Sequence, residues 1–351
     1  MQNRGTVVRY LISSLVCVAV FFLNGYFILF PSEKSSVFPF PASNGSAVLQ
    51  PQEITPTDLS ANQAPADALA STPTVTVDEQ LLATAAKGTV KGKVSEKFIT
   101  PYTAPVSYDS VYLKNSTSKE IDIKSLLPEK LSFAVSQDGT PQVLIMHTHT
   151  TESFLPESRD YYTDKDVSRT RDNRYNMVFL GDIVTQKIAA AGFGVIHDTT
   201  VHDYPEYNGS YDRAAETIKN QLKQNKNIKI VLDLHRDAIA SDNDKTKTVT
   251  EIGSKKAAQI MLVMGCEDGT VKNFPNWREN LKLAVRLQQK IEKMYPTLAR
   301  PVSFMPRKYN ENLITGSTLI EIGTDANSLE EVAYSADLLG NSIVELLKSI
   351  T

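Results

Sequence analysis

The sequence has very little cysteine and no strong excess of either charge. Only two cysteines occur among 351 residues: Cys17 lies in an apolar run, and Cys266 follows the strand-like residues 261–265. Two thiols so placed cannot form a disulfide framework, so the chain depends on a packed core. The formal net charge of -3, with a pI near 6, provides no basic surface for nucleic acid. No internal repeat is present.

One long apolar run does occur, near the N-terminus. Residues 10–30 contain no charge, and about 20 such residues are needed for a helix to cross a bilayer. Arg4 and Arg9 precede the run, which favours a cytoplasmic N-terminus. The alternative is a cleaved signal peptide, but its apolar core would be shorter and followed by small residues, whereas residues 28–31 are large or proline. We therefore expect a cytoplasmic tail at 1–9 and a single-pass anchor in the cell membrane, with the remainder extracytoplasmic.

The composition changes after this run. Residues 31–97 are rich in Pro, Ser, Thr, Ala and Gln and have few aromatic or β-branched clusters, so they cannot bury enough surface to fold. We expect a flexible tether of about 65 residues. Residues 98–137 form a lead-in segment, with a short helix expected at 124–128 and a strand at 131–135. The folded domain is expected at 138–351.

Helical and strand patterns alternate through the expected domain. Short apolar runs predict strands, and apolar residues that recur every three or four positions predict helices. The expected strands are 143–146, 195–197, 228–235, 259–265 and 318–323, and the expected helices begin near residues 177, 211, 280 and 328. This alternation predicts an α/β fold with a mostly parallel sheet and helices on both faces.

Polar residues follow the first of these strands. The run 143–146 ends in His147 and His149, and Glu152 comes three residues later. Open α/β sheets place their chemistry at the carboxyl ends of strands. Imidazole and carboxylate groups are also the ligands that zinc takes at catalytic sites, usually three of them plus a water. The simpler interpretation is that the two histidines only cap the strand and bind a nearby loop.

A second histidine-bearing strand completes a candidate metal site. His235 ends the strand 228–235, and a parallel sheet brings such distant strand ends to one edge. The residue types and spacing suit Zn²⁺ bound by His149, Glu152 and His235. Asp233 and Asp237 flank His235, and either one is placed to hold the second nitrogen of a ligand imidazole.

The terminal strand carries a carboxylate in its interior. Glu321 lies within residues 318–323 and is the candidate general base toward the attacking water. A salt bridge from Glu321 to Arg236 or Arg307 is the structural alternative. If Glu321 is structural, Glu157 or Asp237 becomes the candidate base.

Four motifs in this order resemble the stage II sporulation protein P family. They are HTHTTESFLP at 147–156, HDTTVHDYPEYNGSY at 197–211, DLHRD at 233–237 and LIEIG at 319–323. The resemblance spans about residues 140–350 and extends to the layout of anchor and tether. It implies a zinc-dependent peptidoglycan hydrolase similar in fold to the N-acetylmuramoyl-L-alanine amidases.

The resemblance also implies a reaction and a setting. The implied reaction cleaves the amide between the lactyl group of muramic acid and L-alanine, and endopeptidase activity on stem-peptide cross-links is implied as well. The family acts in forespore engulfment during sporulation, alongside the lytic transglycosylase stage II sporulation protein D. Its substrate is the cell-wall peptidoglycan.

The correspondence with the wider amidase group is uneven. His235 matches its second ligand histidine, and Glu321 matches its terminal catalytic glutamate. That group has a Gly-His-Gly-Gly turn and a ligand glutamate well downstream, whereas here the glycines are missing and Glu152 is close. Alignment of the strand places His149 at the ligand position and leaves His147 as a supporting residue or an alternative ligand. Zinc carboxypeptidases also pair His-x-x-Glu with a later histidine, which supports His149 with Glu152.

Other residues are candidates for a substrate groove. His197 and His202 lie in a loop rich in Asp and Tyr, and a hydrogen-bonded loop is the alternative for both. Arg236 and Tyr211 are further groove candidates.

Two other functions remain open from the sequence. A zinc carboxypeptidase-like peptidase acting on free peptides would need an arginine or similar group to bind a C-terminal carboxylate. A non-catalytic cell-wall-binding scaffold would keep the metal for stability and would not hydrolyse purified wall.

Overall fold

The computed structural model describes residues 75–351. The predicted tail, the anchor at 10–30 and most of the predicted tether lie outside the described residues. Within 75–351, no helix is both long enough and apolar enough to span a membrane.

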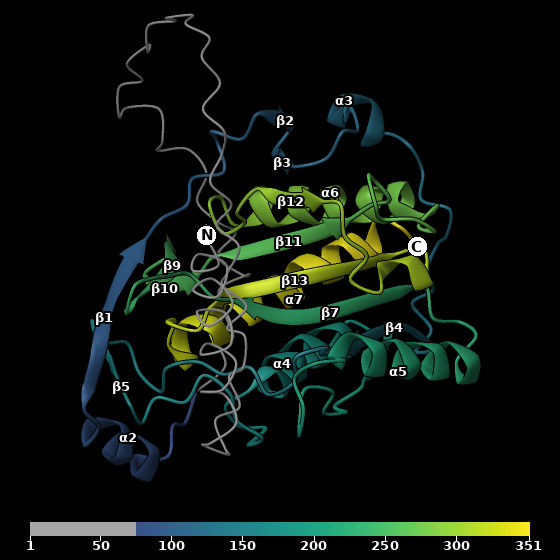
Figure 1. Ribbon diagram of the computed structural model, residues 1–351. Coiled ribbons are helices and arrows are strands. Elements are labelled where there is room, and N and C mark those ends of the chain that lie inside the picture. The colour runs from purple at the N-terminus through teal and green to yellow at the C-terminus, as the bar shows by residue number, and fades with distance from the viewer. Residues whose placement is uncertain (1–74) are drawn as a thin grey trace, which may run out of the picture. The chain divides into compact units, whose positions relative to one another are not determined.

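An eight-stranded sheet forms the centre of the domain (Figure 1). Its strand order is β2-β3-β12-β11-β13-β7-β4-β6, and five of the seven pairings are parallel. The antiparallel pairings are β2 with β3 and β11 with β13. The prediction of a mostly parallel sheet is confirmed. The strands are β2 (Val106–Tyr108), β3 (Val111–Asn115), β4 (Pro141–Met146), β6 (Gly194–His197), β7 (Ile230–Asp237), β11 (Ile260–Gly265), β12 (Val302–Met305) and β13 (Ser317–Thr324).

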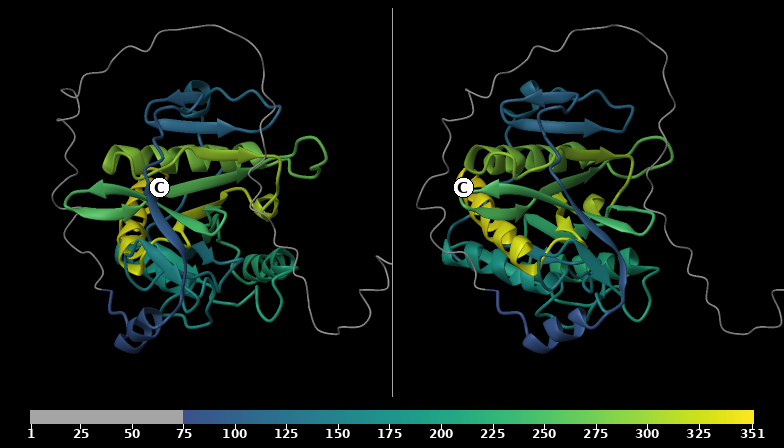
Figure 2. Two further views of the ribbon diagram at one scale, coloured as in Figure 1. Left: turned by 60° about the vertical axis from the view of Figure 1, so that its left-hand side comes forward. Right: turned by 90° about the vertical axis from the view of Figure 1, so that its left-hand side faces the viewer.

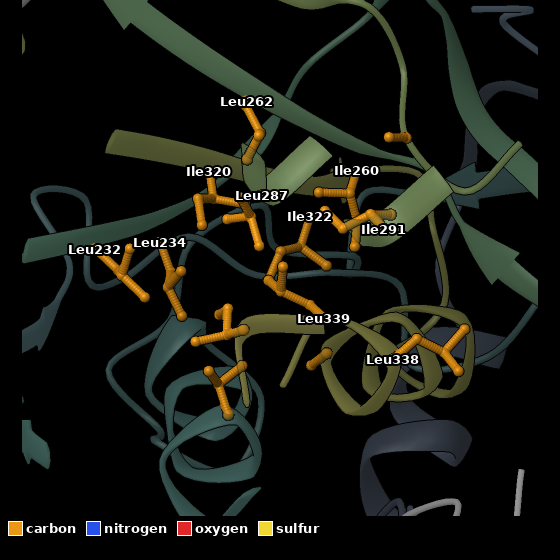
Figure 3. Close-up of a cluster of buried hydrophobic side chains, with 14 of the residues drawn as sticks. Leu232, Leu234, Ile260, Leu262, Leu287, Ile291, Ile320, Ile322, Leu338 and Leu339 are labelled. Carbon is orange, nitrogen blue, oxygen red and sulfur yellow. The ribbon is translucent and has the colours of Figure 1, made fainter. Parts of the chain in front are cut away.

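Helices cover both faces of this sheet, as the sequence predicts. On one face, α4 (Met177–Ala190), α6 (Trp277–Met294) and α7 (Leu329–Lys348) pack against the main apolar core. Figure 3 shows this core, in which side chains of β7, β11 and β13 meet those of α6 and α7. On the other face, α5 (Ser210–Gln224) packs against a smaller cluster of Leu144, Met146, Ala214, Ile218, Ile228 and Val231.

The helix boundaries follow the local signals in the sequence. The Asn176 side chain caps α4 by accepting a hydrogen bond from the Val178 backbone N–H, and Gly192 follows the helix with a φ of 83°. Ser328 and Glu331 form a reciprocal capping box at the start of α7.

A second, smaller sheet corrects the predicted end of the tether. Its order is β10-β9-β1-β5, and β1 is parallel to β9 and antiparallel to β5. The elements are α2 (Glu79–Ala86), β1 (Val90–Lys97), β5 (Tyr161–Thr163), β8 (Ala240–Ser241), β9 (Asp244–Ile252) and β10 (Lys255–Ala258). Figure 2 shows β1 running from α2 toward β2 and β3.

The tether prediction was therefore wrong for residues 79–97. Most of the β1 side chains are exposed, and Val94 alone is buried, against Leu155 and Ala326. The strand exists because its backbone pairs with strands that lie far away in the sequence, and local composition carries no sign of such pairing.

The lead-in segment gives one confirmed element and one error. The expected short helix is α3 (Ile123–Leu126). Residues 131–135 form no strand: Leu131 and Phe133 pack against the core and Val135 is buried, but the segment pairs with none of the described strands. Its apolar residues join the main core without a ladder of backbone hydrogen bonds, and periodicity alone cannot distinguish such a segment from a strand.

Candidate active site

Strand register brings polar residues of neighbouring strands to one edge of the large sheet. Met146, the last residue of β4, is opposite Asp233, and Glu321 of β13 is opposite His235 of β7. Side chains alternate along a strand, and Val231 belongs to the cluster under α5. Asp233, His235 and Glu321 therefore all face the α5 side at the carboxyl end of the strands.

Two histidines and a glutamate meet at this edge. The rings of His149 and His235 are perpendicular, with centroids 5.2 Å apart. The Glu152 Oε2 atom lies 3.6 Å from the Nδ1 atom of His235. All three side chains are buried. The structure thus brings together the three residues that the sequence proposes as zinc ligands.

Asp233 lies at ion-pair distance from the other nitrogen of His235. Its Oδ1 atom lies 2.9 Å from His235 Nε2, and the same carboxylate accepts hydrogen bonds from the backbone and hydroxyl of Thr148. Burial opposes the charged imidazole, but Asp233 and Glu152 outweigh it and raise the pKa of His235 to about 9. Asp237 has a different partner, Arg300, at 2.8 Å. Of the two flanking aspartates, Asp233 is thus the one that orients the ring.

Glu152 lies among cations. Arg169 reaches its Oε1 atom at 3.4 Å, the Arg236 guanidinium lies 3.9 Å away, and the Arg236 backbone N–H donates to Oε2 at 3.2 Å. Burial favours the neutral acid, but Arg236 and His235 together lower the pKa of Glu152 below its ordinary value. The carboxyl group is therefore ionised at neutral pH.

Glu321 is a partly buried residue without an ion-pair partner among the described residues. Its Oε2 atom is buried and has no hydrogen-bond partner. Burial, followed by the charge of Asp237, raises the pKa of Glu321 to about 8, against the opposing charge of His235. Glu321 forms no salt bridge with Arg236 or Arg307, which was the structural alternative. The Arg236 guanidinium instead donates to the carbonyl groups of Ser153, Ser168 and Asp237.

The start of α5 forms one wall of the site. Tyr211 is edge-on to His149 at a centroid distance of 5.5 Å and stacks near His235 at 6.5 Å. Its phenol has a raised pKa, first through burial and then through Asp233 and Glu321. It therefore remains a hydrogen-bond donor. Tyr211 is the groove candidate whose ring lies against both histidines of the cluster.

His147 lies on the opposite side of the sheet. Its Nδ1 atom is 3.1 Å from the Leu234 carbonyl oxygen, and its Nε2 atom is 2.9 Å from Nε2 of His197, whose Nδ1 faces Asp182. The chain turns at residues 148–151, so the side chains of His147 and His149 point to different sides, and α4 comes so close at Gly181 that a Cβ there would lie 2.8 Å from His147 Nε2. His147 and His197 thus form a separate pair.

Three groove candidates are buried or bound elsewhere and are not placed as groove-lining residues. His197 is taken up by the pair with His147 and by Asp182. His202 is 1% exposed, and its two nitrogens lie 2.8 Å from the His147 carbonyl and 2.9 Å from the Thr217 hydroxyl. Arg236 is buried, and its guanidinium donates hydrogen bonds to the carbonyl groups of Ser153 and Ser168 at the two ends of the 153–168 loop. The hydrogen-bonded alternative holds for both histidines, because short loops satisfy their buried backbone groups with such side chains.

The donor set matches zinc in type, and two of its members match in spacing. Donor atoms of a tetrahedral zinc site lie about 3.4 Å apart, close to the 3.6 Å between His235 and Glu152. Within residues 75–351, however, no three His, Cys, Asp or Glu side chains are arranged as a complete metal site. The His149 ring accounts for this, because its nitrogens face the Tyr207 hydroxyl at 3.1 Å and the Ser210 hydroxyl at 3.3 Å.

Sequence reasoning missed several residues around the cluster. Arg169 contacts Glu152 and also pairs with Asp203 at 2.6 Å, and Tyr207 stacks on His149 with centroids 4.6 Å apart. The abundance of Asp and Tyr in residues 198–211 was the available signal. Nothing in the local pattern identifies Arg169, because an antiparallel bridge between Glu152 and Arg169 brings it to the site.

The fold and the cluster define an α/β protein whose sheet presents two histidines and two glutamates at one edge. The chain belongs to the stage II sporulation protein P family, whose model matches residues 73–344. A curated relative, the stage II sporulation protein P of Bacillus subtilis (strain 168), is 31% identical over 215 residues, or 58% of this chain and 50% of the relative. This chain therefore spans about half the length of the curated relative it matches.

Solved structures similar to this chain include two amidases. The N-acetylmuramoyl-L-alanine amidase AmiC2 of Nostoc punctiforme is 16% identical, with a TM-score of 0.37, over 60% of this chain and 99% of that chain. The CwlD amidase from Clostridioides difficile, in complex with the GerS lipoprotein, is 13% identical, with a TM-score of 0.35, over 59% of this chain and 99% of that chain.

Proposed function

We propose that this protein is a zinc-dependent peptidoglycan hydrolase of sporulation. It cleaves the amide between muramic acid and L-alanine during forespore engulfment, with cross-linked stem peptides as a second substrate and the lytic transglycosylase stage II sporulation protein D as its partner. Membership of the family supports the sporulation setting. One observation carries the chemistry: Glu321, whose Oε2 atom is buried and has no hydrogen-bond partner, lies opposite His235 at the sheet edge where His149 and Glu152 also lie.

The roles of the residues follow from their surroundings. His149, Glu152 and His235 would hold the zinc, and Asp233 would fix the orientation of His235. Bound zinc would supply a Lewis acid that polarises the scissile carbonyl group and lowers the pKa of water. Glu321 takes a proton from the attacking water and delivers it to the leaving amine. Tyr211, whose phenol stays protonated, donates a hydrogen bond toward the carbonyl oxygen of the substrate.

Digestion of purified peptidoglycan tests this function. We expect the products to carry new L-alanine amino termini and muramic acid residues without stem peptides, as identified by mass. The protein used should begin at residue 75 and not at 98, because β1 lies between β5 and β9. Asp182→Asn is a suitable control, since Asp182 is an exposed partner of His197 on the other side of the sheet.

Other products would point to other functions. New ends only within the stem peptide would make the enzyme an endopeptidase. Release of single C-terminal residues from free peptides, with no attack on wall, would make it a carboxypeptidase. Metal content without any hydrolysis would favour a cell-wall-binding scaffold.

We also propose that residues 10–30 anchor the protein in the cell membrane with the catalytic domain outside. The absence of charge in this run supports the proposal. Full-length protein should stay with membranes through high-salt washing, and protease added from outside should remove the domain. A mature protein that begins near residue 32 in the medium would contradict an uncleaved anchor.

A further inference from the structure

Two arginine–tyrosine pairs extend outward from His149. The inner pair is Arg169 with Tyr207, in which the guanidinium carbon lies 4.6 Å from the ring centroid and the same tyrosine stacks on His149. The outer pair is Arg171 with Tyr204, at 4.2 Å. Each pair joins the loop that contains residues 169–171 to the loop that contains residues 204–207. The inner pair contacts His149, and the outer pair is the next one along the two loops.

The two loops are held firmly by polar contacts. Residue 169 forms a bridge with residue 152, and the Thr170 N–H donates to the Thr151 carbonyl at 2.7 Å. Asp203 binds both Arg169 and the Thr151 hydroxyl, each at 2.6 Å. Arg171 follows Arg169 by two residues in one of these loops, and Tyr204 precedes Tyr207 by three residues in the other. The loops that carry the outer pair, Arg171 and Tyr204, are therefore held in place next to the His149 cluster.

The two arginines differ in their charge partners. Arg169 is paired with Asp203 and Glu152, and its side chain is 35% exposed. Arg171 is exposed, and within residues 75–351 it has no carboxylate within ion-pair distance; its contact is the half-exposed ring of Tyr204. A guanidinium stacked on an aromatic ring keeps its edge, with its N–H donors, available to a ligand.

We propose that Arg171, stacked on the ring of Tyr204, forms a subsite that binds a carboxylate of the stem peptide. This inference rests on the proposed function and names a residue that determines substrate preference for it. Arginine recognises carboxylates through two parallel hydrogen bonds, and a planar partner behind the guanidinium reduces its freedom before binding. The muramic acid would lie at His149 and Glu321. The stem peptide attached to it extends outward along the two arginine–tyrosine pairs, where its carboxylates meet Arg171.

The test compares two substrates with full-length protein in mild detergent. One is purified peptidoglycan, and the other is the same material with its carboxyl groups converted to amides by carbodiimide and ammonium chloride. Binding is measured by co-sedimentation with the insoluble wall, and hydrolysis by the release of new amino termini. The wild type should bind the amidated wall about tenfold more weakly, the effect of losing one charge-assisted pair.

The variants separate this role from a structural one. Arg171→Gln should bind untreated wall about tenfold more weakly and should respond less than about twofold to amidation, while Arg171→Lys should retain part of the response. Arg174→Gln is the matched control, because Arg174 is exposed, lies 4.9 Å over the ring of Tyr175 and already pairs with Asp172 at 2.6 Å. It should behave as the wild type does.

A full response to amidation in Arg171→Gln would overturn the subsite. So would equal binding of the two walls by the wild type. Failure of the proposed function looks different: the wild type would release no new amino termini from either wall, whatever its binding. A wild type that binds only free peptides with an unmodified C-terminal carboxylate would assign the arginine to carboxypeptidase specificity instead.

Discussion

Replacing His235 with alanine should leave the protein without zinc. His149→Ala and Glu152→Ala should have the same effect, because each removes one of the three proposed protein ligands. Loss of a residue that merely supports a ligand costs about 10–100-fold in metal affinity, so loss of a ligand should exceed about 100-fold. Metal content after dialysis, measured by mass spectrometry on proteins of equal helical content, gives the result.

The supporting residues should give smaller and graded effects. Asp233→Asn keeps the size of the side chain but weakens its hold on His235 Nε2, so zinc affinity should fall by about 10–100-fold. His147→Gln is the matched control, since His147 is a histidine of the same strand end whose nitrogens face Leu234 and His197. It should keep zinc at the wild-type level. Loss of zinc in His147→Gln, with full occupancy in His149→Ala, would exchange the two assignments.

Metal binding should also release a proton. In the metal-free protein, Asp233 and Glu152 raise the pKa of His235 to about 9 despite its burial. A histidine must be neutral to bind zinc, so at neutral pH the metal displaces a proton from this ring. The apparent affinity should therefore rise with pH until His235 is deprotonated without metal. An affinity independent of pH between 6 and 9 would argue against His235 as a ligand.

The sequence predicts the layers of the fold because the large sheet consists of short apolar runs that local patterns identify. The runs 143–146 and 228–235 became β4 and β7 with small shifts at their ends. The small sheet escaped prediction for the opposite reason. β1 buries one side chain, Val94, so its position depends on backbone pairing with β5 and β9, which periodicity cannot detect.

The residues of the candidate site also differ in whether local sequence patterns could predict them. His235 and Glu321 are predictable because they are polar residues at the ends of apolar runs, and strand register sets them opposite each other. The separation of His147 from His149 is less obvious in the sequence, since two residues so spaced on an extended strand would face the same side, and the turn at residues 148–151 is what sets them apart. Arg169 reaches Glu152 through a bridge between two irregular segments. No rule of local periodicity describes such a bridge.

Glu321→Gln should abolish most of the wall-hydrolysing activity and leave the metal in place. A general base contributes about 10²–10⁴-fold to the rate, and glutamine keeps the volume of the side chain but accepts no proton. The pKa of Glu321, raised to about 8 by burial and then by Asp237, is near the value that serves proton transfer at neutral pH. The rate should fall with little change in binding to the wall.

Two controls distinguish a catalytic role of Glu321 from a structural one: the pH dependence of folding stability, and the substitution of a second carboxyl group, Glu292. The folded-state pKa of Glu321 is above the ordinary 4.5, so ionisation destabilises the metal-free fold, and stability should fall as pH rises from about 4.5 to about 8. Glu321→Gln lacks this component and should be at least as stable as the wild type at pH 8. Glu292→Gln alters another buried carboxyl group, one bound to the backbone N–H groups of Thr297 and Ala299, and should remain active. Loss of zinc in Glu321→Gln would make this residue a ligand, and near-normal activity would make it structural.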